Sequence, residues 1–190
     1  GALIPAQTVN PATPVVTVTG TTSFTYNTSA QGPNTATTGG SSGAVTFSYA
    51  GVSGTTYPAS STPPTNAGSY TCTATVAVDS NHTSASSGAT PFTIAKATPV
   101  ITWANPQPIN VGTALGATQL NATSSGATGN FVYTPASGVV LPLGSHTLSV
   151  QFTPTVTANY NTPAATTATI QVAVTSVVFG EEQYQANGAD

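Results

Sequence analysis

The sequence predicts an all-β chain of two tandem antiparallel β-sandwiches, with extended segments at both ends. Three observations predict it. Apolar and polar residues alternate along short runs, clusters of Gly, Pro, Asn and Ser separate those runs, and landmarks of the first half recur in the second. No stretch sustains helical spacing of its apolar residues with capping residues at the ends. Strands are therefore expected throughout.

The alternation is clearest in two runs, 70–78 and 145–152, where every second side chain is expected to face inward. These residues are Tyr70, Cys72, Ala74, Val76 and Val78 in the first run, and His146, Leu148, Val150 and Phe152 in the second. A period of two is typical of a half-buried antiparallel strand. Five to seven such strands in ~80 residues indicate two packed antiparallel sheets of Ig-like type.

The internal repeat predicts two homologous modules. The corresponding segments are PATPVVT (11–17) and KATPVIT (96–102), VTFSY (45–49) and NFVYT (130–134), AGSYTCTATV (67–76) and LGSHTLSVQF (143–152), and DSNH (79–82) and TANY (157–160). Their separation drifts by a few residues along the chain, as insertions in loops would make it. The repeat also makes Asn81 equivalent to Asn159, and His82 equivalent to Tyr160.

The repeat sets the domain boundaries. We expect an N-terminal extension (1–10), a first Ig-like module (11–95), a second Ig-like module (96–176) and a C-terminal extension (177–190). The inter-module linker is Ala95, Lys96 and Ala97. It lacks a flexible Gly/Ser spacer, and Pro99 restricts the residue before it to extended geometry, so an elongated and fairly stiff pair is expected.

The charge composition excludes several classes of function. Of 190 residues only 3% are charged, one is Lys or Arg, and the net charge is −3, whereas a typical soluble domain is about a quarter charged. One strong cation cannot neutralise phosphates, so neither nucleic-acid binding nor attachment to anionic membranes is expected. Membrane insertion is not expected either, because no run approaches the ~20 apolar residues that a span requires.

Catalysis, cofactor binding and metal binding are not expected. Four carboxylates and two histidines supply few acid–base groups, and zinc needs three or four convergent ligands. The single cysteine, Cys72, aligns with Leu148 and is interpreted as a small core residue. Asp79 and Asn81 superficially resemble a calcium loop, but calcium prefers six to eight oxygen ligands, so a site near Asp79 stays an open alternative.

Parts of both modules resemble bacterial repeat families. KATPVITWANPQPINVGTALGATQLNAT with FVYTPASGVVLPLGSHTLSVQFTP resembles a bacterial Ig-like repeat, and VTFSYAG with TYPASSTPPTNAGSYTCTATVAVDSNH is similar to the MBG-like domain. The resemblance covers about residues 12–175. It implies stalks, spacers and adhesive surfaces of extracellular or cell-surface proteins, with no family active site. Such repeats normally belong to longer chains, so whether this chain is whole or a fragment stays open.

The leading hypothesis is a secreted structural protein, with its signal peptide already removed, whose partners are copies of itself. The candidate assembly strands are Ala2, Leu3 and Ile4 at one end and Val177, Val178 and Phe179 at the other. An apolar segment can add as a strand to an open sheet edge of a neighbour. Head-to-tail contacts of this kind do not close, so they build a filament. Which end engages the neighbour stays open.

The alternative is an adhesin or carbohydrate-binding module that recognises host or environmental glycans. Its candidate ligand surface is Trp103 with Tyr133, because exposed aromatic rings bind sugars; core packing is the competing interpretation of both rings. The chain also contains N-glycosylation patterns, which a sequence this rich in threonine matches by chance. Glycosylation and the adhesive target therefore stay undecided, and an enzyme is not expected.

Overall fold

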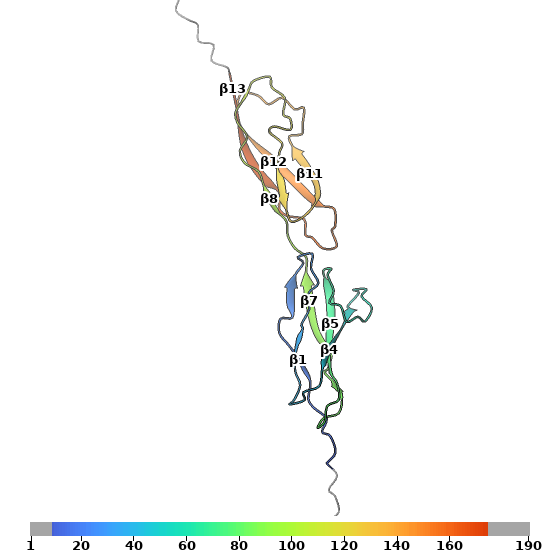
Figure 1. Cartoon of the computed structure of the whole chain (residues 1–190). Coiled ribbons are helices and arrows are strands. Elements are labelled where there is room, and N and C mark those ends of the chain that lie inside the picture. Colours follow the sequence, from blue (N-terminus) through green and yellow to red (C-terminus); the bar gives the residue numbers. More distant parts are fainter. Residues whose placement is uncertain (1–8, 175–190) are drawn as a thin grey trace, which may run out of the picture. The chain divides into compact units, whose positions relative to one another are not determined.

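The computed structural model describes residues 9–174, which contain strands and no helix (Figure 1), so the all-β expectation is confirmed. No helix within that range is long and apolar enough to cross a membrane. The candidate assembly strands 2–4 and 177–179 lie outside the described residues.

Contacts divide the described chain into two compact units. Unit 1 holds the chain up to Pro99 together with Pro154–Thr162, and unit 2 holds Val100–Thr153 together with the described residues from Pro163 onward. The sequence boundary falls instead at 95/96. The segment Pro154–Thr162, which the repeat assigns to the second module, therefore groups with unit 1.

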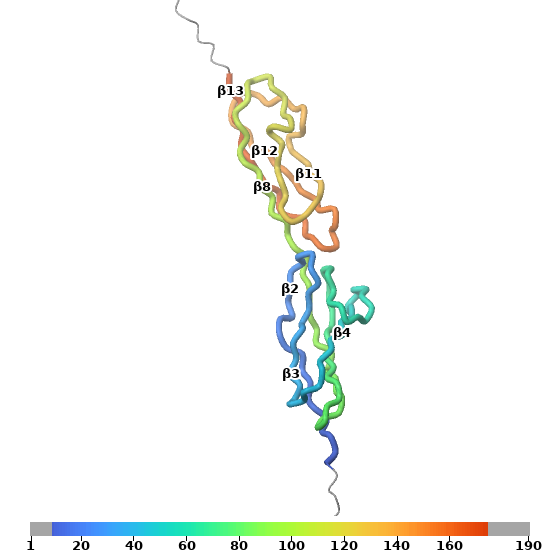
Figure 2. The backbone as a smooth tube through the Cα atoms, viewed as in Figure 1, coloured from blue at the N-terminus to red at the C-terminus, as the bar shows by residue number. Residues whose placement is uncertain are grey.

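Unit 1 contains two sheets. Its strands are β1 (Thr17–Thr19), β2 (Ser23–Thr25), β3 (Thr35–Thr37), β4 (Val45–Val52), β5 (Gly68–Val76), β6 (Ala85–Ser86) and β7 (Thr90–Ala95). The larger sheet has the order β2-β7-β5-β4, with β6 also paired to β5, and the smaller pairs β1 with β3. Figure 2 traces the long loop, residues 53–67, that leaves the sheet between β4 and β5.

Unit 2 repeats this division into a larger and a two-stranded sheet. Its strands are β8 (Val100–Thr102), β9 (Ile109–Asn110), β10 (Thr123–Ser125), β11 (Gly129–Thr134), β12 (Gly144–Pro154) and β13 (Thr166–Ala173). The sheets have the orders β11-β12-β13-β9 and β10-β8. The expectation of purely antiparallel sheets is wrong for two pairs, because β2 runs parallel to β7 and β9 runs parallel to β13. Alternation shows which face is buried but carries no strand direction.

The core of unit 1 gathers around β5. Its alternating residues from Tyr70 to Val76 are at most 1% exposed, and the ring of Phe92 stacks on Tyr70 with centroids 5.3 Å apart. Burial raises the pKa of the Cys72 thiol, as for a residue that packs as a small hydrophobe. The expectation for Val78 is wrong, because β5 ends at Val76 and Val78 is 68% exposed.

The core of unit 2 is built by β12 and β13. Leu148, Val150 and Phe152 are buried on β12, and Ile170 of the paired strand β13 belongs to the same core cluster as Leu148 and Val150. His146, at the start of the same face, is only half-buried, and its Nε2 lies 2.7 Å from the carbonyl oxygen of Pro142.

Candidate functional site

The outer edge of β4 is paired over only half of its length. Its inner side pairs with β5 throughout. On the outer side, Tyr49 exchanges two backbone hydrogen bonds with Ser60, at 2.8 and 2.9 Å, and the N–H of Gly51 donates to the carbonyl of Tyr57. No other segment of the described range pairs with residues 45–48 on that side. An open sheet edge therefore starts at the beginning of β4.

This open edge lies beside the loop formed by residues 78–83. The N–H of Ala77 donates to the carbonyl of Ala44 at 2.9 Å, and Gly43 approaches so closely that an added Cβ would stand 1.9 Å from the carbonyl oxygen of Ala77. The edge and the loop thus belong to one end of unit 1.

Asp79 organises this loop through its carboxylate. Its Oδ2 accepts from the hydroxyl of Ser41 and the N–H of Ser42, each at 2.7 Å. Its Oδ1 accepts from the N–H groups of Asn81 and His82, each at 2.8 Å, and lies 3.1 Å from the His82 ring. Both oxygens of the carboxylate are therefore engaged by donors.

These donors lower the pKa of Asp79. The hydroxyl of Ser41, followed by the N–H groups of Asn81 and Ser42 and by the His82 side chain, holds the pKa of Asp79 well below its usual range. Donated hydrogens occupy the positions from which a carboxylate would bind calcium. The carboxylate accordingly fixes the loop, and the calcium interpretation of Asp79 finds no support in this geometry.

The repeat places two equivalent loops against two equivalent alanines. Ala12 forms a parallel bridge with His82, and Ala97 forms one with Tyr160. In each case the alanine N–H donates to the carbonyl of an asparagine, Asn81 at 2.9 Å or Asn159 at 3.0 Å. The same backbone arrangement therefore occurs twice, at Ala12 and at Ala97.

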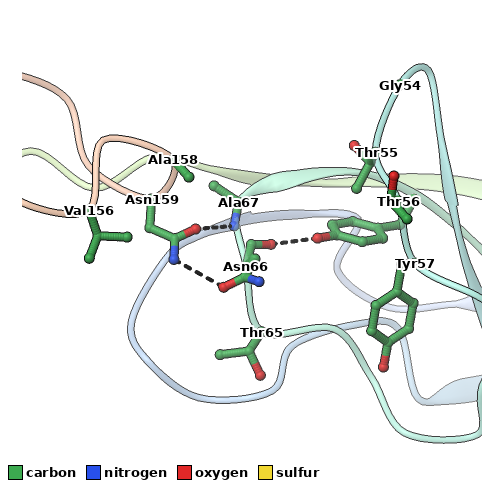
Figure 3. A pocket seen from close by; sticks show the side chains of 11 residues that line it. Gly54, Thr55, Thr56, Tyr57, Thr65, Asn66, Ala67, Val156, Ala158 and Asn159 are labelled. Atoms are coloured by element: carbon green, nitrogen blue, oxygen red, sulfur yellow. Dashed lines mark hydrogen bonds between the residues drawn. The ribbon is translucent and has the colours of Figure 1, made fainter.

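Asn159 is one of the few buried polar residues, with 5% of its surface exposed. Its Oδ1 accepts from the N–H of Ala67 at 2.9 Å, and its Nδ2 donates to Oδ1 of Asn66 at 3.0 Å (Figure 3). Two directional bonds at a buried amide anchor the loop that carries Asn159 within unit 1.

A pocket of about 450 Å³ lies beside Asn159, as Figure 3 shows. Tyr57 and Tyr70 line it, but the hydroxyl of Tyr57 donates to the carbonyl of Thr62, and that of Tyr70 donates to the carbonyl of Asn66. The hydroxyls of these two rings are therefore already bonded within the protein.

Another open edge belongs to unit 2. β11 is one of the two outer strands of its sheet. Phe131, Val132 and Tyr133 from this strand line an apolar pocket of about 430 Å³ together with Leu120. Val132 is 55% exposed. This edge therefore offers apolar side chains beside unpaired backbone.

Trp103 belongs to the core of unit 2. It is 8% exposed, its indole N–H donates to the carbonyl of Gln119 at 3.0 Å, and its ring meets Tyr133 edge-on with centroids 5.3 Å apart. The hydroxyl of Tyr133 in turn accepts from the N–H of Ala122. The pair is packed together, so Trp103 presents no exposed aromatic face for a glycan.

The predicted linker residues are ordered by contacts within unit 1. Ala95 is the last residue of β7, and Ala97 carries the bridge described above. The Nζ of Lys96 donates to the carbonyl of Thr157 at 2.7 Å. Its ammonium thus satisfies a loop carbonyl and lies near no carboxylate of residues 9–174, where Asp79 is the only acid.

The two histidines do not converge. His82 contacts Asp79 in unit 1, and His146 lies on β12 in unit 2. Within residues 9–174, no three His, Cys, Asp or Glu side chains are grouped to hold a metal ion.

Sequence reasoning did not single out Asn159 and Asn66. The available signal was the shared asparagine of DSNH and TANY, which precedes His82 in one module and Tyr160 in the other. Why only Asn159 is buried depends on which residues face it, and a single sequence does not give these contacts.

No family model matches this chain, and no curated protein matches it.

Proposed function

We propose that this chain is a non-enzymatic structural subunit of two Ig-like β-sandwich modules, outside the cell or at its surface, that assembles head-to-tail by β-strand addition. The observation that carries the proposal is the open half of β4, residues 45–48. An added strand gains main-chain hydrogen bonds there. No charged residue occurs from 41 to 52 to guard the edge.

The donor in this proposal is residues 175–180 of a neighbouring copy. Their sequence, TSVVFG, contains β-branched and aromatic residues that favour strands, and it contains no proline. The competing donor, residues 2–4, is followed by Pro5, which cannot donate to a strand ladder. Contacts between one end and a different surface do not close on themselves, so they extend into fibres.

The chemistry of the described residues supports a structural role. Asp79 is the only acid among the described residues, and both of its carboxylate oxygens accept hydrogen bonds that order a loop. Cys72 is buried, and its pKa is raised. The burial of Trp103 argues against the glycan-binding alternative that is based on its ring.

Negative-stain microscopy of the full-length chain tests the proposal, beside variants lacking 177–190 or 1–10. We expect filaments that disappear when 177–190 is removed and persist when 1–10 is removed. Ser48→Lys places a charge on the exposed face of β4 and should also abolish filaments, since lysine on an edge strand opposes pairing.

The matched control is Val132→Lys, which places the same charge on β11, an outer strand of the larger sheet in unit 2. Filaments that vanish only with Val132→Lys would move the acceptor to β11 and its apolar pocket. If all variants and the parent stay as isolated particles at every concentration tried, the assembly proposal is wrong.

A further inference from the structure

The two equivalent loops differ in one respect, the state of their asparagine side chains. Asn159 is buried and bonded to Ala67 and Asn66. Asn81, its counterpart in the repeat, is exposed, and its side-chain amide has no hydrogen-bond partner among residues 9–174. The backbone of both loops is held in the same way by Ala12 and Ala97. The 78–82 loop is therefore an undocked copy of the 156–160 loop.

The residues that receive Asn159 also have a counterpart. The repeat aligns Asn66 and Ala67 with Pro142 and Leu143. The hydroxyl of Tyr70 bonds the carbonyl of Asn66 at 2.7 Å, and His146, the equivalent of Tyr70, lies 2.7 Å from the carbonyl of Pro142. The receiving backbone is thus built in the same way in unit 2.

That second receiving segment is unoccupied by any described residue. Leu143 is 60% exposed, and its N–H, the equivalent of the Ala67 N–H that binds Asn159, has no partner among residues 9–174. Proline at 142 removes the amide that Asn66 supplies, so one of the two hydrogen bonds can be reproduced.

We propose that the 78–82 loop of one copy docks on residues 142–144 of a second copy, with the side chain of Asn81 accepting from the N–H of Leu143. The template for this contact is the 156–160 loop, in which Oδ1 of Asn159 accepts from the N–H of Ala67. This contact goes beyond strand addition: it uses only described residues and does not need 175–180.

Exposed apolar side chains accompany both proposed contact surfaces, the 78–82 loop and residues 142–144. Val78, the counterpart of Val156, is 68% exposed, and Val9 is 87% exposed. The loop that leads to Leu143 exposes Val139 and Val140, at 39% and 53%. Neither surface carries a strong cation. The one acid, Asp79 on the first surface, stays ionised and is bonded by its own donors, and the second surface carries no charge to pair with it. A contact between two such surfaces therefore depends on burial and on the Asn81 bond, and little on ionic strength.

Sedimentation equilibrium of the full chain measures this association. Asn81→Ala should raise the dissociation constant roughly tenfold, because it removes the acceptor of a desolvated N–H. Asn34→Ala is the matched control, since Asn34 is also exposed and belongs to neither surface. Equal dissociation constants for both variants and the parent, or a monomeric parent at millimolar concentration, would overturn the docking.

Cross-linking locates the contact. A mixture of Asn81→Cys and Leu143→Cys chains should form a disulfide-linked heterodimer on mild oxidation, whereas Asn34→Cys with Leu143→Cys should not; native Cys72 is fully buried. The cross-link should persist when 177–190 is removed, which separates this inference from strand addition. Equal cross-linking in both mixtures, or none in either, contradicts it.

Discussion

Asp79 shows how a single carboxylate can organise a chain almost without charges. Hydroxyl and N–H donors from two segments, 41–42 and 81–82, converge on its oxygens, and their hydrogen bonds are made to the ionised form. The carboxylate therefore stabilises unit 1 only while it is ionised, and this makes the stability depend on pH.

The first prediction concerns that pH dependence. The pKa of Asp79 is depressed in the folded chain, so its stabilising effect is complete above the unfolded pKa of about 3.9 and is lost as the pH falls below it. The melting temperature of the parent should drop on acidification from pH 5 to pH 2, while that of Asp79→Asn, lower at pH 7, should change less. Scanning calorimetry across this range measures both. Parallel curves would show that Asp79 contributes nothing.

Asn159 is the second residue at which one substitution should be informative. Asn159→Ala leaves the N–H of Ala67 and the amide of Asn66 without their partner. The expected loss is about 1–3 kcal/mol in the free energy of unfolding. Urea unfolding followed by tyrosine fluorescence measures it.

The control for this substitution is Asn161→Ala. Asn161 is exposed and bonds Thr98, so its loss should change the free energy by less than about 0.5 kcal/mol. Equal effects at the two positions would refute the anchoring role of Asn159.

At the scale of elements, sequence alternation locates the long strands well. β5 and β12 lie where the period of two predicts them, and the residues predicted to face inward are buried from Tyr70 to Val76 and from Leu148 to Phe152. Val78 continues the same pattern but lies beyond the end of β5. Alternation continues into loops because nothing in it records where pairing stops.

Pairing direction and edges depend on long-range contacts that alternation does not encode. The parallel pair of β2 with β7 joins residues about 70 positions apart, as in Ser23 opposite Thr93. Likewise, the half-open edge of β4 results from the return of Tyr57 and Ser60 to its second half. The half-open edge of β4 was therefore not predictable from the sequence.

The start of β4 gives an element-scale prediction. Gly43→Ala would place a Cβ 1.9 Å from the carbonyl oxygen of Ala77, so the backbone must shift where the loop meets β5. We expect a loss of about 1–3 kcal/mol in the free energy of unfolding. Gly88→Ala, with no atom within 4 Å of the added Cβ, is the matched control and should be near neutral. Chemical denaturation of both variants decides whether close approach explains Gly43.

At the scale of the whole molecule, composition and structure both predict a weak dependence on salt. A chain with 3% charged residues has little electrostatic repulsion between copies. Hydroxyls and amides take part in hydrogen bonds that join distant segments, as at Asp79 and Asn159. Folding and self-association should therefore respond weakly to salt.

Trypsin gives a test of the whole chain, because Lys96 is its only Lys or Arg and so its only tryptic site. Ala95 is paired in β7, Ala97 is bonded to the 156–160 loop, and the Lys96 side chain donates to Thr157. Proteolysis requires local opening of the cleaved backbone, so the native chain should resist trypsin.

Asn159→Ala should speed cleavage about 5- to 150-fold, because local opening becomes easier by the free energy that the Asn159 hydrogen bonds supply. Asn34→Ala, at an exposed position that bonds neither Lys96 nor the 156–160 loop, should leave the rate nearly unchanged. Mass spectrometry of the fragments 1–96 and 97–190 measures the rates, and rapid cleavage of the parent would show that the contacts around Lys96 do not persist in solution.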